Sequence, residues 1–150
     1  MSDTLRQGIA KRANRYCEYC QCPEAFSPSP FSPSPFSLEH ISPRTLGGTD
    51  VPANLAWSCM GCNGHKGTAI QNTDPISGLL FPLFHPRRQT WTDHFRWSND
   101  GLLILGITPV GRATVDRLKV NRPEVINLRG VLVLAGLHQV QRNNSLSQAE

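Results

Sequence analysis

The sequence predicts a small α+β fold, and three of its features support this prediction. Two C-x2-C pairs, Cys17/Cys20 and Cys59/Cys62, are separated by 38 residues. Between them lie short apolar segments with strand character, and around them lie segments with helical periodicity. Twelve Pro and twelve Gly among 150 residues indicate many loops, so a metal site would help to hold such a chain together.

The first 36 residues are expected to form a helix, a cysteine turn and an extended loop. The helix covers residues 4–14, where Thr4 can cap it and where Leu5, Ile9 and Ala13 share one face. Residues 27–36 repeat SPSPF twice, and alternating Ser-Pro favours extended, polyproline-like structure. We expect this repeat to be exposed and non-catalytic, with a peptide ligand for a partner protein as the alternative.

The middle of the chain predicts two strands followed by a helix. The strands span residues 36–41 and 54–58, and the loop between them is punctuated by proline and glycine. A helix is expected over residues 59–70, where Gly64 and Gly67 weaken it. Residues 71–90 contain three prolines and are predicted to be mostly loop.

The last third predicts a small C-terminal α/β annex. GLLILGI, at residues 101–107, is a strand candidate, and residues 108–119 place a Thr N-cap and a first-turn Pro at the start of a helix. Pro123 can begin another helix, although VLVLAGL at residues 131–137 could form a strand instead. The polar tail after Gln139 is expected to fray.

Basic charge is concentrated in this annex. The net charge is +4, and residues 1–84 hold six basic and six acidic residues, whereas residues 85–130 hold eight and four. We therefore expect a core domain of residues 1–84 and a basic annex of residues 85–150 that packs on it. An Arg-rich segment suits a polyanionic partner, with an ordinary soluble surface as the alternative.

The chain is expected to be cytoplasmic and to have no membrane association. No apolar run approaches the roughly 20 residues that a membrane span needs, and the polar N-terminus lacks the apolar region of a secretory signal. Five cysteines in such a chain favour metal binding or reduced thiols over disulfides.

Each C-x2-C pair can aim two thiolates at one ion from a tight turn. Together Cys17, Cys20, Cys59 and Cys62 would complete the four-thiolate tetrahedron that Zn²⁺ prefers. Four thiolates close the coordination sphere, so this zinc would be structural and not catalytic. An iron–sulfur site or reactive dithiols are the alternatives. The fifth cysteine, Cys22, is expected to be a packed or exposed thiol.

Three motifs follow one another along residues 15–67: CEYC, then EHISP with GG after it, then NLAWSCMGCNGHKG. In these motifs and in their order the chain resembles the HNH endonuclease family. The resemblance implies a ββα-metal (His-Me finger) nuclease core, in which two strands and a helix surround one divalent ion. Beyond Phe84, HPRRQTWTDHFRW and ITPVGRATVDRL resemble the tail of free-standing bacterial or phage members.

The resemblance also implies a role for each matching residue. His40 falls on the general base that deprotonates a water, and Asn54 falls on the Asn that holds the loop and orients the base. Glu39 and Asn63 fall on ligands of a catalytic Mg²⁺ or Mn²⁺, with His65 as an alternative ligand or phosphate contact. This ion would stabilise the leaving 3′-oxygen.

These residue types suit the hydrolysis of a phosphodiester. The reaction needs a base for the water, positive charge for the transition state and help for the leaving oxygen. Neutral imidazole is a suitable base near pH 7, and carboxylate and amide oxygens are hard ligands. Because adjacent strand residues face opposite ways, Glu39 and His40 can serve one phosphate only if the strand ends or twists there, as Pro43 favours.

The expected partner is double-stranded DNA. Arg44 and Lys66 are candidate phosphate contacts, with plain solvated charge as the alternative. The aromatic, basic segment 91–97 could form a nucleic-acid face or could anchor the annex to the core. The alternatives are a non-catalytic zinc module that binds nucleic acid, a ribonuclease, and an accessory nuclease of a larger defence or mobile-element system. The motifs leave open the oligomeric state and the choice between nicking and double-strand cleavage.

Overall fold

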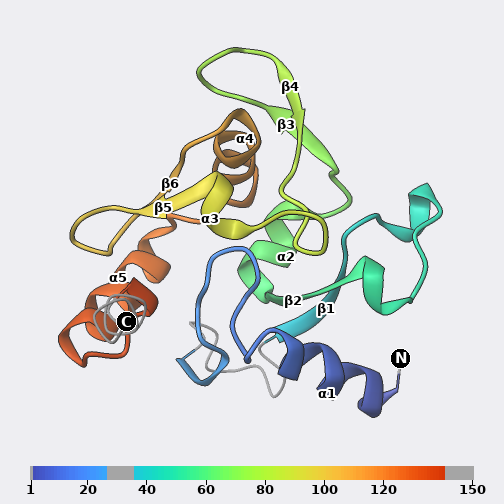
Figure 1. Ribbon diagram of the computed structural model, residues 1–150, viewed down its shortest axis with the longest axis horizontal. Coiled ribbons are helices and arrows are strands. Elements are labelled where there is room, and N and C mark those ends of the chain that lie inside the picture. Colours follow the sequence, from blue (N-terminus) through green and yellow to red (C-terminus); the bar gives the residue numbers. More distant parts are fainter. Residues whose placement is uncertain (1, 27–35, 141–150) are drawn as a thin grey trace.

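The computed structural model describes residues 2–26 and 36–140 (Figure 1). The helices are α1 (Asp3–Arg12), α2 (Met60–Lys66), α3 (Trp91–His94), α4 (Pro109–Leu118) and α5 (Pro123–Leu134). The strands are β1 (Phe36–His40), β2 (Leu55–Cys59), β3 (Gln71–Thr73), β4 (Leu80–Pro82), β5 (Phe95–Trp97) and β6 (Ile104–Gly106). The predicted mixture of helices and strands is therefore confirmed. The SPSPF loop at residues 27–35 and the tail beyond residue 140 lie outside the described residues.

Helix α1 begins two residues earlier than the predicted Thr4 cap would place it. Ser2 is the N-cap, and its side chain accepts a hydrogen bond from the backbone N–H of Leu5. The helix buries Ile9 against the core, and Arg12 from its last turn donates to the backbone oxygen of Leu55 in β2. Helix α1 is thereby attached to the central strand pair.

Strands β1 and β2 form an antiparallel pair whose register runs from Phe36 opposite Cys59 to His40 opposite Leu55. All five residues of β2 are buried, so this strand lies at the centre of the molecule. Helix α2 follows β2 without a loop and lies between the strand pair and α4 in Figure 1. It ends at Lys66 instead of near residue 70, because Gly67 adopts a φ of +56°.

Residues 71–90 contain a hairpin that the sequence prediction of mostly loop did not include. Strand β3 pairs with β4, and Asp74 in the connecting turn accepts two hydrogen bonds from Arg112 of α4 at 2.8 and 2.9 Å. This pairing with Arg112 lowers the pKa of Asp74. Each strand has only three residues and no clear alternation of apolar residues, so the strands bury little apolar surface by themselves. The hairpin therefore depends on the contact between Asp74 and Arg112.

The C-terminal third contains the β5–β6 pair and two helices. Strand β6 covers only Ile104–Gly106 of the predicted strand, and its partner β5 lies in a segment for which no strand was predicted. The predicted cap of α4 is confirmed, since the Thr108 side chain accepts from the Gly111 N–H at 3.0 Å. Residues 123–134 form helix α5, so the alternative strand at residues 131–137 is wrong.

The aromatic segment that includes α3 and β5 packs inward. The Trp91 ring stacks near Phe95 and Trp97, and its indole N–H donates to the backbone oxygen of Tyr19 at 2.9 Å. These contacts favour the anchoring role over a nucleic-acid face.

One hydrophobic core joins residues on both sides of residue 84, including Trp57 of β2 and Leu118 of α4. The division into residues 1–84 and 85–150 stays a prediction. Among the described residues, no helix has the length and apolar character to cross a bilayer.

Candidate functional site

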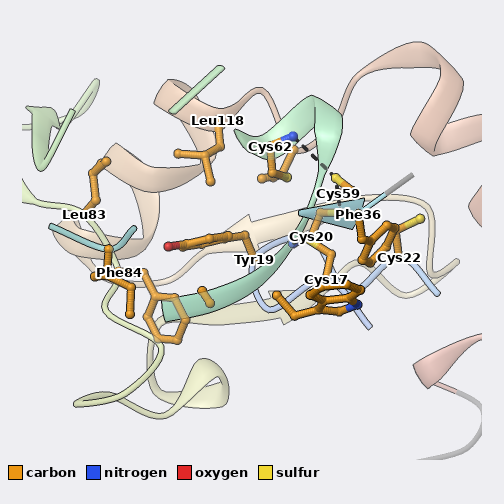
Figure 2. Packing of buried hydrophobic residues seen from close by; sticks show 14 of the residues in the cluster. Cys17, Tyr19, Cys20, Cys22, Phe36, Cys59, Cys62, Leu83, Phe84 and Leu118 are labelled. Carbon is orange, nitrogen blue, oxygen red and sulfur yellow. Dashed lines mark hydrogen bonds between the residues drawn. The ribbon is translucent and has the colours of Figure 1, made fainter. Parts of the chain in front are cut away.

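Four cysteines from two distant turns meet in one buried cluster. The sulfur atoms of Cys17, Cys20, Cys59 and Cys62 all lie within 4.8 Å of one another. Figure 2 shows these cysteines on one side of the core, away from Leu83 and Phe84. The first pair precedes β1 and the second pair joins β2 to α2, so the cluster connects the N-terminal turn to the centre of the fold.

The two halves of the cluster have the same local geometry. The backbone N–H of Cys20 donates to the sulfur of Cys17 at 3.5 Å, and that of Cys62 donates to the sulfur of Cys59 at 3.4 Å. Such N–H groups stabilise thiolates, which are the form that binds metal. None of the cysteines is in a disulfide.

The spacing of the sulfurs fits zinc. With Zn–S bonds of about 2.3 Å, the sulfurs of a tetrahedral site lie about 3.8 Å apart. The sulfurs of Cys20 and Cys59, which come from opposite pairs, are 3.7 Å apart. All four candidate ligands are cysteine sulfurs and all are buried, so an ion here would have no open position for a substrate. The cluster is therefore suited to a structural zinc ion.

Arg122, just before α5, supplies positive charge to this cluster. Its guanidinium donates to the sulfur of Cys62 and to that of Cys59, each at 3.8 Å. Burial by itself would lower the pKa of Arg122, but the charges of Cys62 and Cys59 raise it overall. A Cβ at position 61 would come within 2.5 Å of this guanidinium, so Gly61 makes the approach possible. Arg122 thereby connects the start of α5 directly to the four-cysteine cluster.

Replacing Arg122 by Met should keep much of the side-chain volume but remove its charge and its donors to sulfur. Partners of metal ligands commonly contribute about 10- to 100-fold to metal affinity, so we expect zinc to be lost faster to a chromogenic chelator by a factor in that range. The control is Glu124→Gln, which changes only the carboxylate that contacts Arg122 Nε at 3.2 Å. Equal rates of zinc release from wild type and Arg122→Met would contradict this role.

His40 lies at the end of β1 and points toward the loop that follows. Its Nε2 is 2.7 Å from Oδ1 of Asp50, and the Nε of Arg44 lies farther away, at 3.4 Å. Because the contact with Asp50 is the shorter one, Nε2 carries a proton and donates it in a hydrogen bond to the Asp50 carboxylate. In the neutral ring Nδ1 then has no proton. Nδ1 makes no hydrogen bond to any residue within 2–26 and 36–140.

Asp50 is held in turn by Arg44. The Arg44 guanidinium donates to both carboxylate oxygens of Asp50, at 2.9 and 3.0 Å. Hydrogen bonds lower the pKa of Asp50, the one from His40 more than those from Arg44, so the carboxylate remains charged beside the ring. His40, Asp50 and Arg44 therefore form a small polar cluster at the protein surface.

Asn54 closes the loop that carries this cluster. Its Oδ1 accepts from the backbone N–H of Ser42 at 2.9 Å, and its Nδ2 donates to the backbone oxygens of Ser42 and Thr49 at 3.0 and 2.9 Å. Gly48 lies so close to the Ser42 backbone oxygen and the Asn54 amide that a Cβ there would clash. These contacts fix the backbone on both sides of Asp50.

Glu39 points the other way, into the protein. Its Oε1 is 2.6 Å from Nζ of Lys66, in an ion pair that lacks hydrogen-bond geometry, and both side chains are only 2% exposed. Its Oε2 accepts a hydrogen bond from the Tyr19 hydroxyl at 2.6 Å. Burial raises the pKa of Glu39, and Lys66 offsets part of this shift. Burial and the Glu39 charge also raise the pKa of Tyr19, which therefore keeps its proton and donates.

The residues at the expected Mg²⁺ or Mn²⁺ site do not fit a hydrated ion in this arrangement. Such an ion keeps several waters, but the Glu39 carboxylate is enclosed and already neutralised by Lys66. Asn63 directs its amide N–H to the Ser37 hydroxyl at 2.8 Å. The described residues gather three or more His, Cys, Asp or Glu ligands only at the four-cysteine cluster.

The two predicted phosphate contacts differ in their placement. Arg44 is exposed beside His40, as a phosphate contact requires. Lys66 is buried and also donates to the backbone oxygen of Ile41 at 3.1 Å, so a surface phosphate contact by Lys66 does not agree with the structure. His65 is exposed on the neighbouring position of α2.

Sequence reasoning missed Asp50, Tyr19 and Arg122. A carboxylate ten residues after His40, inside the loop before Asn54, was a usable signal for Asp50. Tyr19 stands between two metal-ligand cysteines, where an aromatic residue is expected simply to pack. No sequence signal links Arg122 to the cysteines 60 and 63 residues earlier, because only tertiary packing brings them together.

Comparison with protein families identifies one match. The model of the HNH endonuclease family matches residues 17–69, about a third of the chain. This segment contains the four cysteines, His40, Asp50, Asn54 and Asn63. No curated protein and no solved structure matches the chain.

Proposed function

We propose, from the premise that residues 17–69 are an HNH endonuclease segment, that this protein hydrolyses phosphodiester bonds of DNA. The observation that carries the proposal is the 2.7 Å contact between His40 Nε2 and Asp50. This contact supports a general base whose ring is held by Asp50 and whose other nitrogen, Nδ1, can accept a proton from a water. Under this proposal β1, β2 and α2 are the ββα unit of the nuclease, and the four-cysteine cluster holds it together around zinc.

His40 is the general base of the proposed reaction. Nδ1 takes a proton from a water, and the resulting hydroxide attacks phosphorus opposite the 3′-oxygen. The phosphorus–3′-oxygen bond breaks, and the departing oxygen takes a proton from solvent. The products carry a 5′-phosphate and a 3′-hydroxyl. Asp50 stabilises the imidazolium that forms, as a carboxylate does behind a catalytic histidine.

Arg44 is the cation nearest to this base. It is exposed and faces the same carboxylate as His40, so it can contact a phosphate oxygen from the solvent side. The basic residues of the annex add affinity for the nucleic-acid backbone without regard to sequence. The proposed partner is double-stranded DNA in the cytoplasm. The expected Mg²⁺ or Mn²⁺ at Glu39 and Asn63 enters no step here, because Lys66 holds that carboxylate.

One observation favours a second candidate function. The enclosure of Glu39 removes the predicted open ligand of the catalytic ion, as would be expected of a zinc-stabilised module that binds nucleic acid without cutting it. Incubation of pure zinc-loaded protein with supercoiled plasmid, with and without Mg²⁺ or Mn²⁺, separates the two. Conversion to nicked or linear DNA supports the nuclease, whereas a shift in mobility without conversion supports the binding module.

Replacing Asp50 by Asn should slow cleavage about tenfold or more, because an amide can hold the ring in the wrong tautomer. We expect kcat to fall while KM changes little, since the change affects the base and not the binding of DNA. Asp50→Glu should restore part of the rate. Asp50 is exposed, so zinc content and circular dichroism should match wild type. A wild-type rate in Asp50→Asn would contradict the positioning role.

A further inference from the structure

The strongest disagreement between the family pattern and this structure lies at Glu39. The family pattern assigns this acid to a catalytic ion, yet its two oxygens already have partners inside the protein. Lys66 Nζ is 2.6 Å from Oε1, and the Tyr19 hydroxyl is 2.6 Å from Oε2. A carboxylate in this state offers no open oxygen to an ion that arrives from solvent.

The position of Lys66 is determined by more than this ion pair. Its ammonium also donates to the backbone oxygen of Ile41 at 3.1 Å and approaches that of His40 at 3.4 Å. These are the two residues at which β1 ends and the loop that carries Asp50 begins. Lys66 is in the last turn of α2, so the ammonium connects this helix to the end of the strand.

The Glu39 carboxylate cannot easily bind a divalent cation while the Lys66 ammonium lies beside it. A divalent ion at Oε1 would lie within a few ångströms of Nζ, and two positive charges at such a distance repel strongly in a buried site. The buried carboxylate supplies one negative charge, which Lys66 already neutralises. Either cation can therefore compensate Glu39, but both cannot occupy the place beside Oε1.

We propose that the Lys66 ammonium is the resident cation of Glu39, and that in the protein free of nucleic acid it excludes a divalent cation from this carboxylate. Lys66 thereby supplies the fixed positive charge at the end of β1. The inference concerns the site of the proposed function. The test of this inference measures metal binding and not cleavage. The inference can therefore fail while the proposed function holds, and the proposed function can fail while the inference holds.

The test is Mn²⁺ binding to zinc-loaded protein without DNA, measured by loss of the electron paramagnetic resonance signal of free Mn²⁺. Four variants accompany wild type: Glu39→Gln, Lys66→Met, Lys66→Arg and the double variant Glu39→Gln/Lys66→Met. Lys66→Met keeps the length of the side chain and removes its charge. Lys66→Arg is the matched control that keeps the charge. Zinc content and circular dichroism verify that each protein is folded.

We expect wild type, Glu39→Gln and Lys66→Arg to bind Mn²⁺ equally weakly. Lys66→Met should bind at least about tenfold more tightly, because removal of one charge relieves the repulsion. The double variant should lose this gain, since no carboxylate remains. Folded Lys66→Met that binds no better than wild type would overturn the proposal.

If Lys66→Met does not fold, the comparison of wild type with Glu39→Gln decides. Mn²⁺ binding that wild type has and Glu39→Gln lacks would mean that the carboxylate is open to the ion, and the proposal would be wrong. Equal Mn²⁺ binding by the two proteins would uphold it.

Discussion

Replacing Cys59 by Ser should abolish zinc binding and with it the folded state. Cys59 is the last residue of the fully buried strand β2, the N-cap of α2 and a member of the four-sulfur cluster. The free energy of zinc binding to structural sites, about 10–16 kcal/mol, is as large as the whole stability of a typical domain, about 5–15 kcal/mol. Without the fourth thiolate the cluster cannot supply this stabilisation.

The measurements are zinc content by elemental analysis and secondary structure by circular dichroism at 25 °C. We expect one zinc per chain in wild type, and in Cys59→Ser no bound zinc and loss of the cooperative thermal transition. Treatment of wild type with a strong chelator should have the same effect. Cys59→Ser that stays fully folded without zinc would disprove the structural role of the cluster.

Cys22→Ser is the matched control for this experiment. Cys22 is buried close to the cluster, but its sulfur contacts the backbone oxygen of Pro23 at 3.6 Å and it is not one of the four clustered ligands. Serine can donate to the same oxygen, so zinc content should remain at one per chain. Loss of zinc from Cys22→Ser would instead assign Cys22 to the metal site.

Replacing His40 by Ala should lower the rate of DNA cleavage by about 10²- to 10⁴-fold, which is the usual contribution of a general base. The His40 side chain is 18% exposed at the end of β1, and it bonds to the exposed Asp50 and Arg44. Its removal should therefore leave the fold and the zinc content unchanged. The measurement is the conversion of supercoiled plasmid by matched amounts of wild type and His40→Ala.

Binding provides the internal control for His40→Ala. Affinity for DNA, measured by fluorescence anisotropy, should remain within a few fold of wild type, because the variant keeps the basic residues that we propose bind the backbone. Equal cleavage by the two proteins would refute the assignment of the base. Loss of both cleavage and DNA binding would mean that the ring acts in binding instead.

Local sequence patterns accounted for the four-cysteine cluster and for most helices. Two C-x2-C pairs predict a shared ion, because each turn holds its two thiolates in place whatever the rest of the chain does. In the same way Thr108 and Pro109 predicted the start of α4, since an N-cap and a first-turn Pro act within four residues.

Short strands were predicted less well for a physical reason. The β3–β4 hairpin has three residues on each strand, too few for an alternation of apolar residues to be recognised. Its turn is stabilised by Asp74, whose partner Arg112 lies 38 residues later. A strand of this length forms because a neighbour holds it, and that neighbour is not visible in the local sequence.

By itself the sequence determined which chemical groups are present: four paired cysteines for zinc, and a histidine beside an acid at the end of a strand. Only the tertiary structure decided which groups face one another. It paired His40 with Asp50 and directed Glu39 inward to Lys66, because adjacent residues on β1 project to opposite sides. It also brought Arg122 to the cysteines, since long-range charge pairs depend on packing and not on spacing along the chain.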